Sequence, residues 1–134
     1  MSMMQRTKGK VGEREVAALI RDATGWDVQR RVRQHEGDSD LDGVPGWTIE
    51  VKRHKSAGRG EIAAWWRQAA AQGVVLLPAL FYRLDRSDWR AVWPVAVLMT
   101  NQRANYWAGY EWTCDTSVEA WAAVAREIHA RRGG

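Results

Sequence analysis

The chain has 134 residues, of which 46% are hydrophobic and 27% charged. This length and composition predict a single domain, covering 1–134, whose hydrophobic core needs no disulfide bonds. A single cysteine, Cys114, excludes an intrachain disulfide and a cysteine-rich zinc site. Segment 1–10 is polar and basic and has no apolar stretch like that of a secretory signal, and the longest apolar run, 74–82, is too short to span a membrane. We therefore expect a cytoplasmic protein without a membrane partner.

The first half of the chain predicts a helix followed by strands. Apolar residues recur at helical spacing over 8–24, and Gly25 follows directly. Alternating apolar and polar residues predict a strand over 26–33. Residues 40–44 and 47–52 are expected to form a β-hairpin around the Pro45-Gly46 turn.

The second half predicts a second helix over 60–72, closed by Gly73, and two further strands over 74–82 and 89–97. The last of these strands is expected at a sheet edge, because Pro94 cannot donate to a β-ladder.

The last element is expected to be a helix over 117–131, which Thr116 and Glu119 would open as a capping box. This order of helices and strands predicts an α/β fold with a mixed central sheet flanked by helices. We expect disorder in 1–7 and 132–134.

Charges are segregated along the chain, although the net charge is only +4. Segment 34–51 contains no Lys or Arg but has five acids, and basic residues lie on both sides of it. A metal site inside a phosphate-binding groove would have this pattern. A solvated loop would show it too, and the pattern alone favours that simpler interpretation.

The strand 47–52 carries the first candidate site residues. Period-two alternation places Trp47, Ile49 and Val51 on one face, with Glu50 and Lys52 on the other, roughly 7 Å apart along the strand. On most sheets such a pair is a plain ion pair.

The hairpin brings a second carboxylate to this pair. With the turn centred on Pro45, Asp40 lies opposite Glu50, and Asp42 lies opposite Thr48. Opposed carboxylates destabilise a sheet unless a cation lies between them, so this arrangement indicates a bound metal. Asp42 shares the parity of Asp40, and alternation does not decide between them.

Glu13 is a third candidate carboxylate. At ~100° per residue it falls inside the apolar arc of the first helix, between Ile20 and Ala17. A carboxylate on a buried face needs a partner. The alternative is a partly exposed acid that the helix dipole favours in the first turn.

Together these residues resemble the PD-(D/E)xK nuclease superfamily. Glu50-Val51-Lys52 matches the E-x-K motif, and Ser39-Asp40 stands where the motif has Pro-Asp. Within the superfamily, the chain looks similar to archaeal-type Holliday junction resolvases and their bacteriophage relatives. The features that carry this likeness are Glu13 in the run 8–15, the run 40–53, a helix with Trp65, Trp66 and Gln68, and a strand ending in Tyr82-Arg83. The resemblance covers roughly 8–97.

The resemblance implies a restriction-endonuclease-like domain that hydrolyses DNA phosphodiester bonds with Mg²⁺, for which Mn²⁺ would substitute. Asp40 and Glu50 would be metal ligands, with the Val51 carbonyl and Glu13 as further ligands. Lys52 would orient water or stabilise charge, and Gln68 and Asp42 are accessory candidates. The basic flanks supply the candidate DNA contacts, which are Arg30, Arg31, Arg33, Arg53, Lys55 and Arg59.

The same resemblance implies a homodimer that binds four-way DNA junctions and makes symmetrical paired nicks in DNA recombination and repair, in the host cytoplasm if a phage encodes it. No small-molecule cofactor is expected.

Adjacent Trp65 and Trp66 cannot face the same way, so we expect one in the core and the other exposed at an interface. Two alternatives are a duplex or nicking endonuclease of restriction or repair type, and a DNA-binding module on the same fold that does not cleave.

Overall fold

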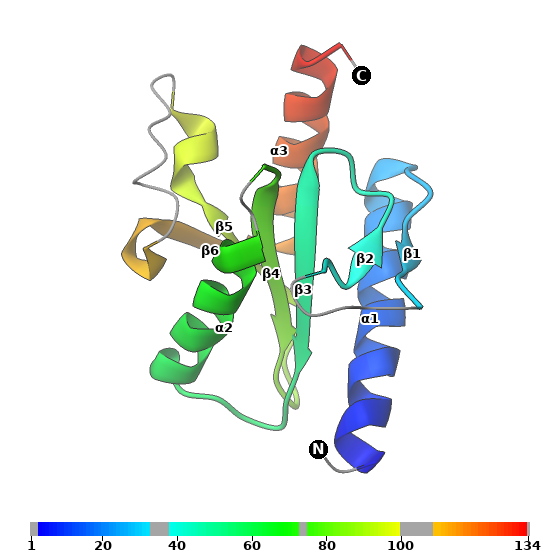
Figure 1. Cartoon of the computed structure of the whole chain (residues 1–134), viewed down its shortest axis with the longest axis vertical. Coiled ribbons are helices and arrows are strands. Elements are labelled where there is room, and N and C mark those ends of the chain that lie inside the picture. Colours follow the sequence, from blue (N-terminus) through cyan, green and yellow to red (C-terminus); the bar gives the residue numbers. More distant parts are fainter. Residues whose placement is uncertain (1–2, 33–37, 73–74, 100–108, 134) are drawn as a thin grey trace.

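A four-stranded sheet with helices on both faces forms the centre of the computed structural model, which describes residues 3–32, 38–72, 75–99 and 109–133 (Figure 1). In chain order the elements are α1 (Met3–Thr24), β1 (Gln29–Arg30), β2 (Leu41–Asp42), β3 (Trp47–Arg53), α2 (Arg59–Gln72), β4 (Leu77–Arg83), β5 (Arg90–Pro94), η1 (Val95–Leu98), η3 (Tyr110–Trp112), β6 (Thr113–Ser117) and α3 (Val118–Arg131). The α/β class with a mixed sheet is confirmed. No helix in the described ranges is long and apolar enough to cross a membrane.

The central sheet has the order β3-β4-β5-β6. Strands β3 and β4 run parallel, joined by α2, and the other two pairs are antiparallel. Figure 1 shows α2 on one face of the sheet and α1 and α3 on the other. This arrangement leaves β3 at one edge of the sheet, beside α1 and the short β1–β2 pair.

Alternation along the strands divides the core between the two faces. On the α1 and α3 face, Trp47, Ile49 and Val51 pack with Phe81 and Trp121. The other face is covered by α2. There the buried residues are Ile62, Trp66, Ala69, Leu80, Tyr82 and Val92. The predicted faces of β3 are thus confirmed, and its polar side chains lie on the α2 side.

The ends of the outer helices follow from local chemistry. Helix α1 ends at Gly25, whose φ of +80° suits glycine, and whose N–H donates to the carbonyl of Arg21 at 2.8 Å. The helix begins at Met3, so residues 3–7 are helical where we expected disorder, and residues 1–2 lie outside the described ranges. At α3 the predicted capping box is wrong by one residue. The N-cap is Ser117, whose Oγ accepts from the N–H of Ala120 at 3.1 Å.

Strand β5 is not at a sheet edge as predicted, because it pairs with β4 on one side and β6 on the other. Pro94 is the last residue of β5, beyond its pairing with β4, where a missing N–H disturbs the ladder least. The strand at that edge of the sheet, opposite the β3 edge, is β6, which is not predicted from the sequence. Its residues Thr113–Ser117 show no apolar alternation.

The predicted hairpin is wrong as a paired ladder. The chain does reverse over 44–47, where the N–H of Trp47 donates to the carbonyl of Val44 at 3.2 Å. However, β2 pairs with β1 in a separate two-stranded sheet, and β3 pairs with β4. The strand expected over 26–33 is reduced to Gln29–Arg30, and residue 33 lies outside the described part of the chain.

Candidate active site

Asp40 and Glu50 are buried side by side at the edge strand β3. Their relative exposures are 8% and 5%. The N–H of Asp40 donates to the carbonyl of Ile49 at 2.8 Å, and Asp40 Oδ2 accepts from the N–H of Val51 at 2.7 Å. These two bonds flank Glu50 in the chain, so Asp40 is fixed beside it without a continuous β-ladder.

Ser39 holds the backbone that carries Asp40. Its buried Oγ accepts from the N–H of Ile49 at 2.9 Å and donates to the carbonyl of Leu41 at 2.8 Å. A serine in this place joins the segment before β2 to β3 through its side chain. From the sequence, Ser39 is recognised only as the residue in place of the motif proline.

Both carboxylate oxygens of Glu50 have donors nearby. Lys52 Nζ lies 3.4 Å from Oε1, and Gln72 Nε2 donates to Oε2 at 2.8 Å. Lys52 follows Glu50 on the same face of β3, as alternation predicts, and Gln72 is the last residue of α2. The site therefore combines residues of β3, α2 and the segment before β2.

Asp40 has a strongly perturbed acidity. Burial of its carboxyl and the charge of Glu50 raise the pKa of Asp40 from 3.8 to about 7, with a smaller raising effect from Glu13. The Val51 N–H and Lys52 act in the opposite direction. The ionised form of Asp40 is destabilised by burial and by its acidic neighbours, and a cation close to it would offset that repulsion.

Glu13 is buried on the inner face of α1, at 9% exposure, as its place in the apolar arc predicts. Its Oε1 forms an ion pair with Arg30 Nε at 2.8 Å. Arg30, which was expected to contact DNA, is thus engaged next to the site through Glu13. The pKa of Asp40 responds to Glu13, so the three carboxylates share one electrostatic environment.

These residues fit a hard divalent cation by their chemistry. Within the described part of the chain, no group of three or more His, Cys, Asp or Glu side chains is arranged to hold a metal ion. However, carboxylate and neutral oxygens are the ligands that Mg²⁺ and its hydration waters prefer. Two such neutral oxygens, Thr48 Oγ1 and Gln72 Oε1, are buried and accept no hydrogen bond from the described residues.

The two accessory candidates lie apart from this cluster. Asp42 is exposed and forms an ion pair with Arg31 at 2.5 Å. Gln68 is exposed on α2. The glutamine that contacts Glu50 is Gln72, which was not predicted and lies one helical turn beyond Gln68.

Most of the predicted DNA contacts already have partners inside the protein. Arg53 Nη1 forms an ion pair with Asp85 at 2.8 Å. Lys55 is exposed, and Arg59 lies over the ring of Tyr110 at 6.0 Å. Arg33 lies outside the described residues. Lys55 and Arg59 flank the start of α2, beyond the end of β3 that carries Lys52.

Of the adjacent tryptophans Trp65 and Trp66, one lies in the core as expected, but the other is not exposed. Trp66 is fully buried under the sheet. Trp65 is half-buried rather than exposed, because its ring stacks on His54 at a centroid distance of 4.6 Å.

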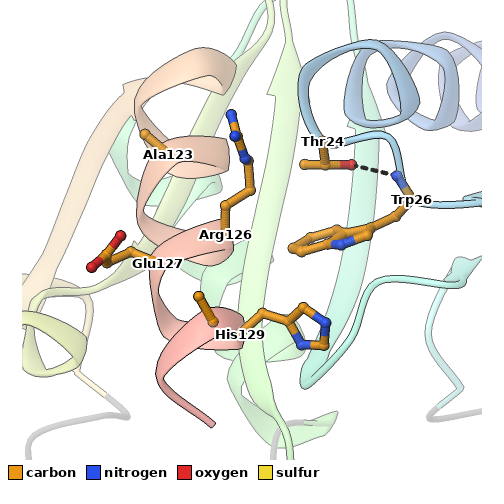
Figure 2. A pocket seen from close by; sticks show the side chains of 7 residues that line it. Thr24, Trp26, Ala123, Arg126, Glu127 and His129 are labelled. Carbon is orange, nitrogen blue, oxygen red and sulfur yellow. Dashed lines mark hydrogen bonds between the residues drawn. The ribbon is translucent and has the colours of Figure 1, made fainter. Parts of the chain in front are cut away.

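A separate surface pocket lies between the end of α1 and α3, where Trp26 meets His129 edge-on (Figure 2). None of the predicted site residues lines it.

The fold and the D…E-x-K arrangement at an edge strand define a nuclease of the PD-(D/E)xK class with a restriction-endonuclease-like fold. Comparison with known proteins gives the family. The profile of the phage putative PDDEXK endonucleases matches residues 4–120, and the chain belongs to this family.

Two relatives are similar to this chain. Protein D14 of Escherichia phage T5 is 28% identical over 112 residues, covering 66% of this chain and 70% of that protein. Among solved structures, Hjc of Archaeoglobus fulgidus, a Holliday junction resolvase from an archaeal hyperthermophile, matches with a TM-score of 0.52 and 21% identity. That match covers 87% of this chain and 96% of the archaeal one, and it supports the fold.

Proposed function

We propose that this protein is a divalent-metal-dependent DNA endonuclease whose preferred substrate is a four-way junction. The observation that carries the proposal is the buried cluster of Asp40 and Glu50 with Lys52 beside it, on a fold shared with a junction resolvase. The two buried carboxylates of Asp40 and Glu50, side by side, favour a bound cation, and the ligand types suit Mg²⁺, with Mn²⁺ as a substitute.

Each residue has a distinct role in this proposal. Asp40 and Glu50 would hold the ion, together with the carbonyl of Val51, and Glu13 would support the same site through its charge. When bound, the ion lowers the pKa of a water and offsets the charge that develops on the phosphate. Lys52 would orient the attacking water and stabilise that charge from the α2 side of β3. Lys55 and Arg59 would contact phosphates beyond the site.

The assembly proposed for this reaction is a homodimer. One domain carries one site, whereas resolution of a junction needs two cuts placed symmetrically, which two sites related by a two-fold axis supply. The expected product is therefore a pair of nicks related by symmetry about the branch point. Association with DNA would weaken steeply with salt, because phosphate contacts release counterions.

The experiment that tests the proposal compares a labelled four-way junction with a linear duplex of the same arm sequence. Cleavage is followed with Mg²⁺, with Mn²⁺ and with chelator, and binding is measured in chelator at several salt concentrations. We expect symmetrical nicks in the junction and none with chelator. The matched control is Glu50→Gln, which should bind the junction without cutting it, while light scattering reports the oligomeric state.

Two outcomes would replace this proposal. Equal affinity for junction and duplex, with cleavage of both, would favour the duplex or nicking endonuclease. Junction or duplex binding without cleavage in either metal would favour the non-cleaving DNA-binding module. A monomer that nevertheless makes symmetrical nicks would contradict only the proposed homodimer.

A further inference from the structure

Gln72 is brought to the candidate site by the packing of α2 on the sheet. It is the last residue of α2, and that helix is fixed to the sheet by Trp66 and Ala69, which pack on buried residues of β4 and β5. Figure 1 shows α2 on one face of the sheet, and the contacts of Gln72 and Lys52 with Glu50 place these side chains on that face. A side chain held by such packing can define the position of its partner.

The hydrogen bond from Gln72 distinguishes the two oxygens of Glu50. Gln72 Nε2 donates to Oε2 at 2.8 Å, a short bond to a buried acceptor, whereas Lys52 Nζ is 3.4 Å from Oε1. A neutral amide stabilises the carboxylate charge without adding a positive charge that would repel a cation. Oε1, with the longer contact, is the oxygen of Glu50 that can most readily exchange its partner.

The other end of the same amide is unusual. Gln72 Oε1 is buried and has no hydrogen-bond donor among the described residues, and the same holds for Thr48 Oγ1, two residues before Glu50. A buried acceptor without a donor carries a free-energy cost, which a bound water or a hydrated cation would offset. Both oxygens are of the type that hydrated divalent cations prefer.

Taken together, these contacts lead us to propose that Gln72 is a positioning residue. Its Nε2 fixes Oε2 of Glu50, and Oε1 of Glu50 is thereby presented to the divalent cation. The inference rests on the proposed function, since it concerns the same metal site. Without Gln72, Glu50 remains buried next to Asp40 but loses the donor that fixes its orientation. The site then requires a higher cation concentration.

The test measures cation binding directly, by thermal unfolding of the DNA-free protein titrated with Mg²⁺ and with Mn²⁺. Gln72→Met keeps the length of the side chain and removes both polar ends. We expect it to raise the half-saturating Mg²⁺ concentration about tenfold. Ala64→Met, at an exposed position on the same helix, is the matched control and should titrate like the unchanged protein.

Gln72→Glu separates positioning from simple packing. It places a second carboxylate against Glu50, so the metal-free protein should unfold at a lower temperature than the unchanged chain. Added Mg²⁺ should then raise its unfolding temperature by more than in the unchanged chain, because the cation offsets the new repulsion. This variant is nearly isosteric with the parent and should fold even if Gln72→Met does not.

The results are distinguishable from failure of the nuclease proposal. If both Gln72 variants unfold at lower temperature but keep the unchanged half-saturating concentration, Gln72 is only structural and the inference is wrong. If the unchanged protein binds Mg²⁺ and Gln72→Met binds it weakly, the inference stands even when no DNA substrate is cut. An unchanged protein that does not respond to either cation contradicts both.

Discussion

Asp40 Oδ2 accepts a hydrogen bond of 2.7 Å from the N–H of Val51, the residue between Glu50 and Lys52. This bond ties the side chain of Asp40 to the backbone of β3 between Glu50 and Lys52. The two carboxylates are therefore held together by the fold itself. Their mutual repulsion is retained in the native state, so a cation that binds beside them would also raise stability.

Asp40→Asn should abolish cleavage and remove a pH dependence of stability. Because burial and Glu50 raise the pKa of Asp40 to about 7, the native state binds its proton more tightly than the unfolded chain does. The stabilisation is complete below the unfolded value of 3.8 and is lost as the pH rises through about 7. Metal-free protein should thus lose about 1 kcal/mol between pH 6 and 8.

Denaturant unfolding in chelator at the two pH values measures this loss, and Asp40→Asn should not show it. The asparagine keeps an oxygen that can accept from Val51, so the variant should fold and bind DNA as tightly or more tightly. Full cleavage activity in Asp40→Asn would exclude Asp40 from the site.

Asp42→Asn should affect cleavage far less than Asp40→Asn. Asp42 is exposed, and its ion pair with Arg31 lies at the surface, where such pairs contribute at most about 1 kcal/mol. We expect cleavage of the same junction within about threefold of the unchanged protein. A reversed order of severity, measured under identical metal conditions, would make Asp42 the metal ligand.

The sequence predicted the parts of the fold that depend on one helix or strand. The helical period of α1 placed Glu13 on the buried face, and the alternation in β3 separated Ile49 from Glu50 and Lys52. These patterns are local, so each is visible without knowing what packs against it. The fold class followed from the order of such elements.

The parts that depend on pairing between distant segments could not be predicted in this way. Strand β2 has only two residues, and nothing in their sequence shows that they pair with β1 rather than β3. Gln72 reaches Glu50 across the space between α2 and the sheet, a contact set by how the helix packs. Ser39 acts through hydrogen bonds to Ile49 and Leu41 that no residue pattern encodes.

Arg30→Met should destabilise the metal-free protein by about 1–3 kcal/mol, because it takes the guanidinium away from Glu13, a buried carboxylate close to Asp40. The double variant with Glu13→Gln should recover most of that stability, since the charge that needed the guanidinium is then absent. Urea unfolding of the four proteins in chelator gives the coupling energy.

The ion pair of half-buried Arg31 with exposed Asp42 supplies the control for this cycle. Arg31→Met should cost less than about 1 kcal/mol. Equal costs for Arg30→Met and Arg31→Met would mean that the ion pair of Glu13 has no special importance for the site.

Ser39→Ala should reduce cleavage by more than its effect on stability explains. The substitution removes the Oγ that links the N–H of Ile49 and the carbonyl of Leu41, which costs about 1–3 kcal/mol. Asp40, the next residue, then shifts relative to Glu50, and small displacements of catalytic groups cost large factors in rate. We expect kcat to fall at least about tenfold well below the unfolding temperature.

Thr24→Ala is the matched control for this last variant, because Thr24 Oγ1 also makes two hydrogen bonds, to the carbonyl of Ile20 and from the N–H of Trp26. These bonds lie at the end of α1, away from the carboxylates. Thr24→Ala should lower the unfolding temperature similarly and leave kcat unchanged. If Ser39→Ala also keeps its kcat, the link from Ser39 to β3 contributes to stability only, and Asp40 is positioned by its bonds to Ile49 and Val51 alone.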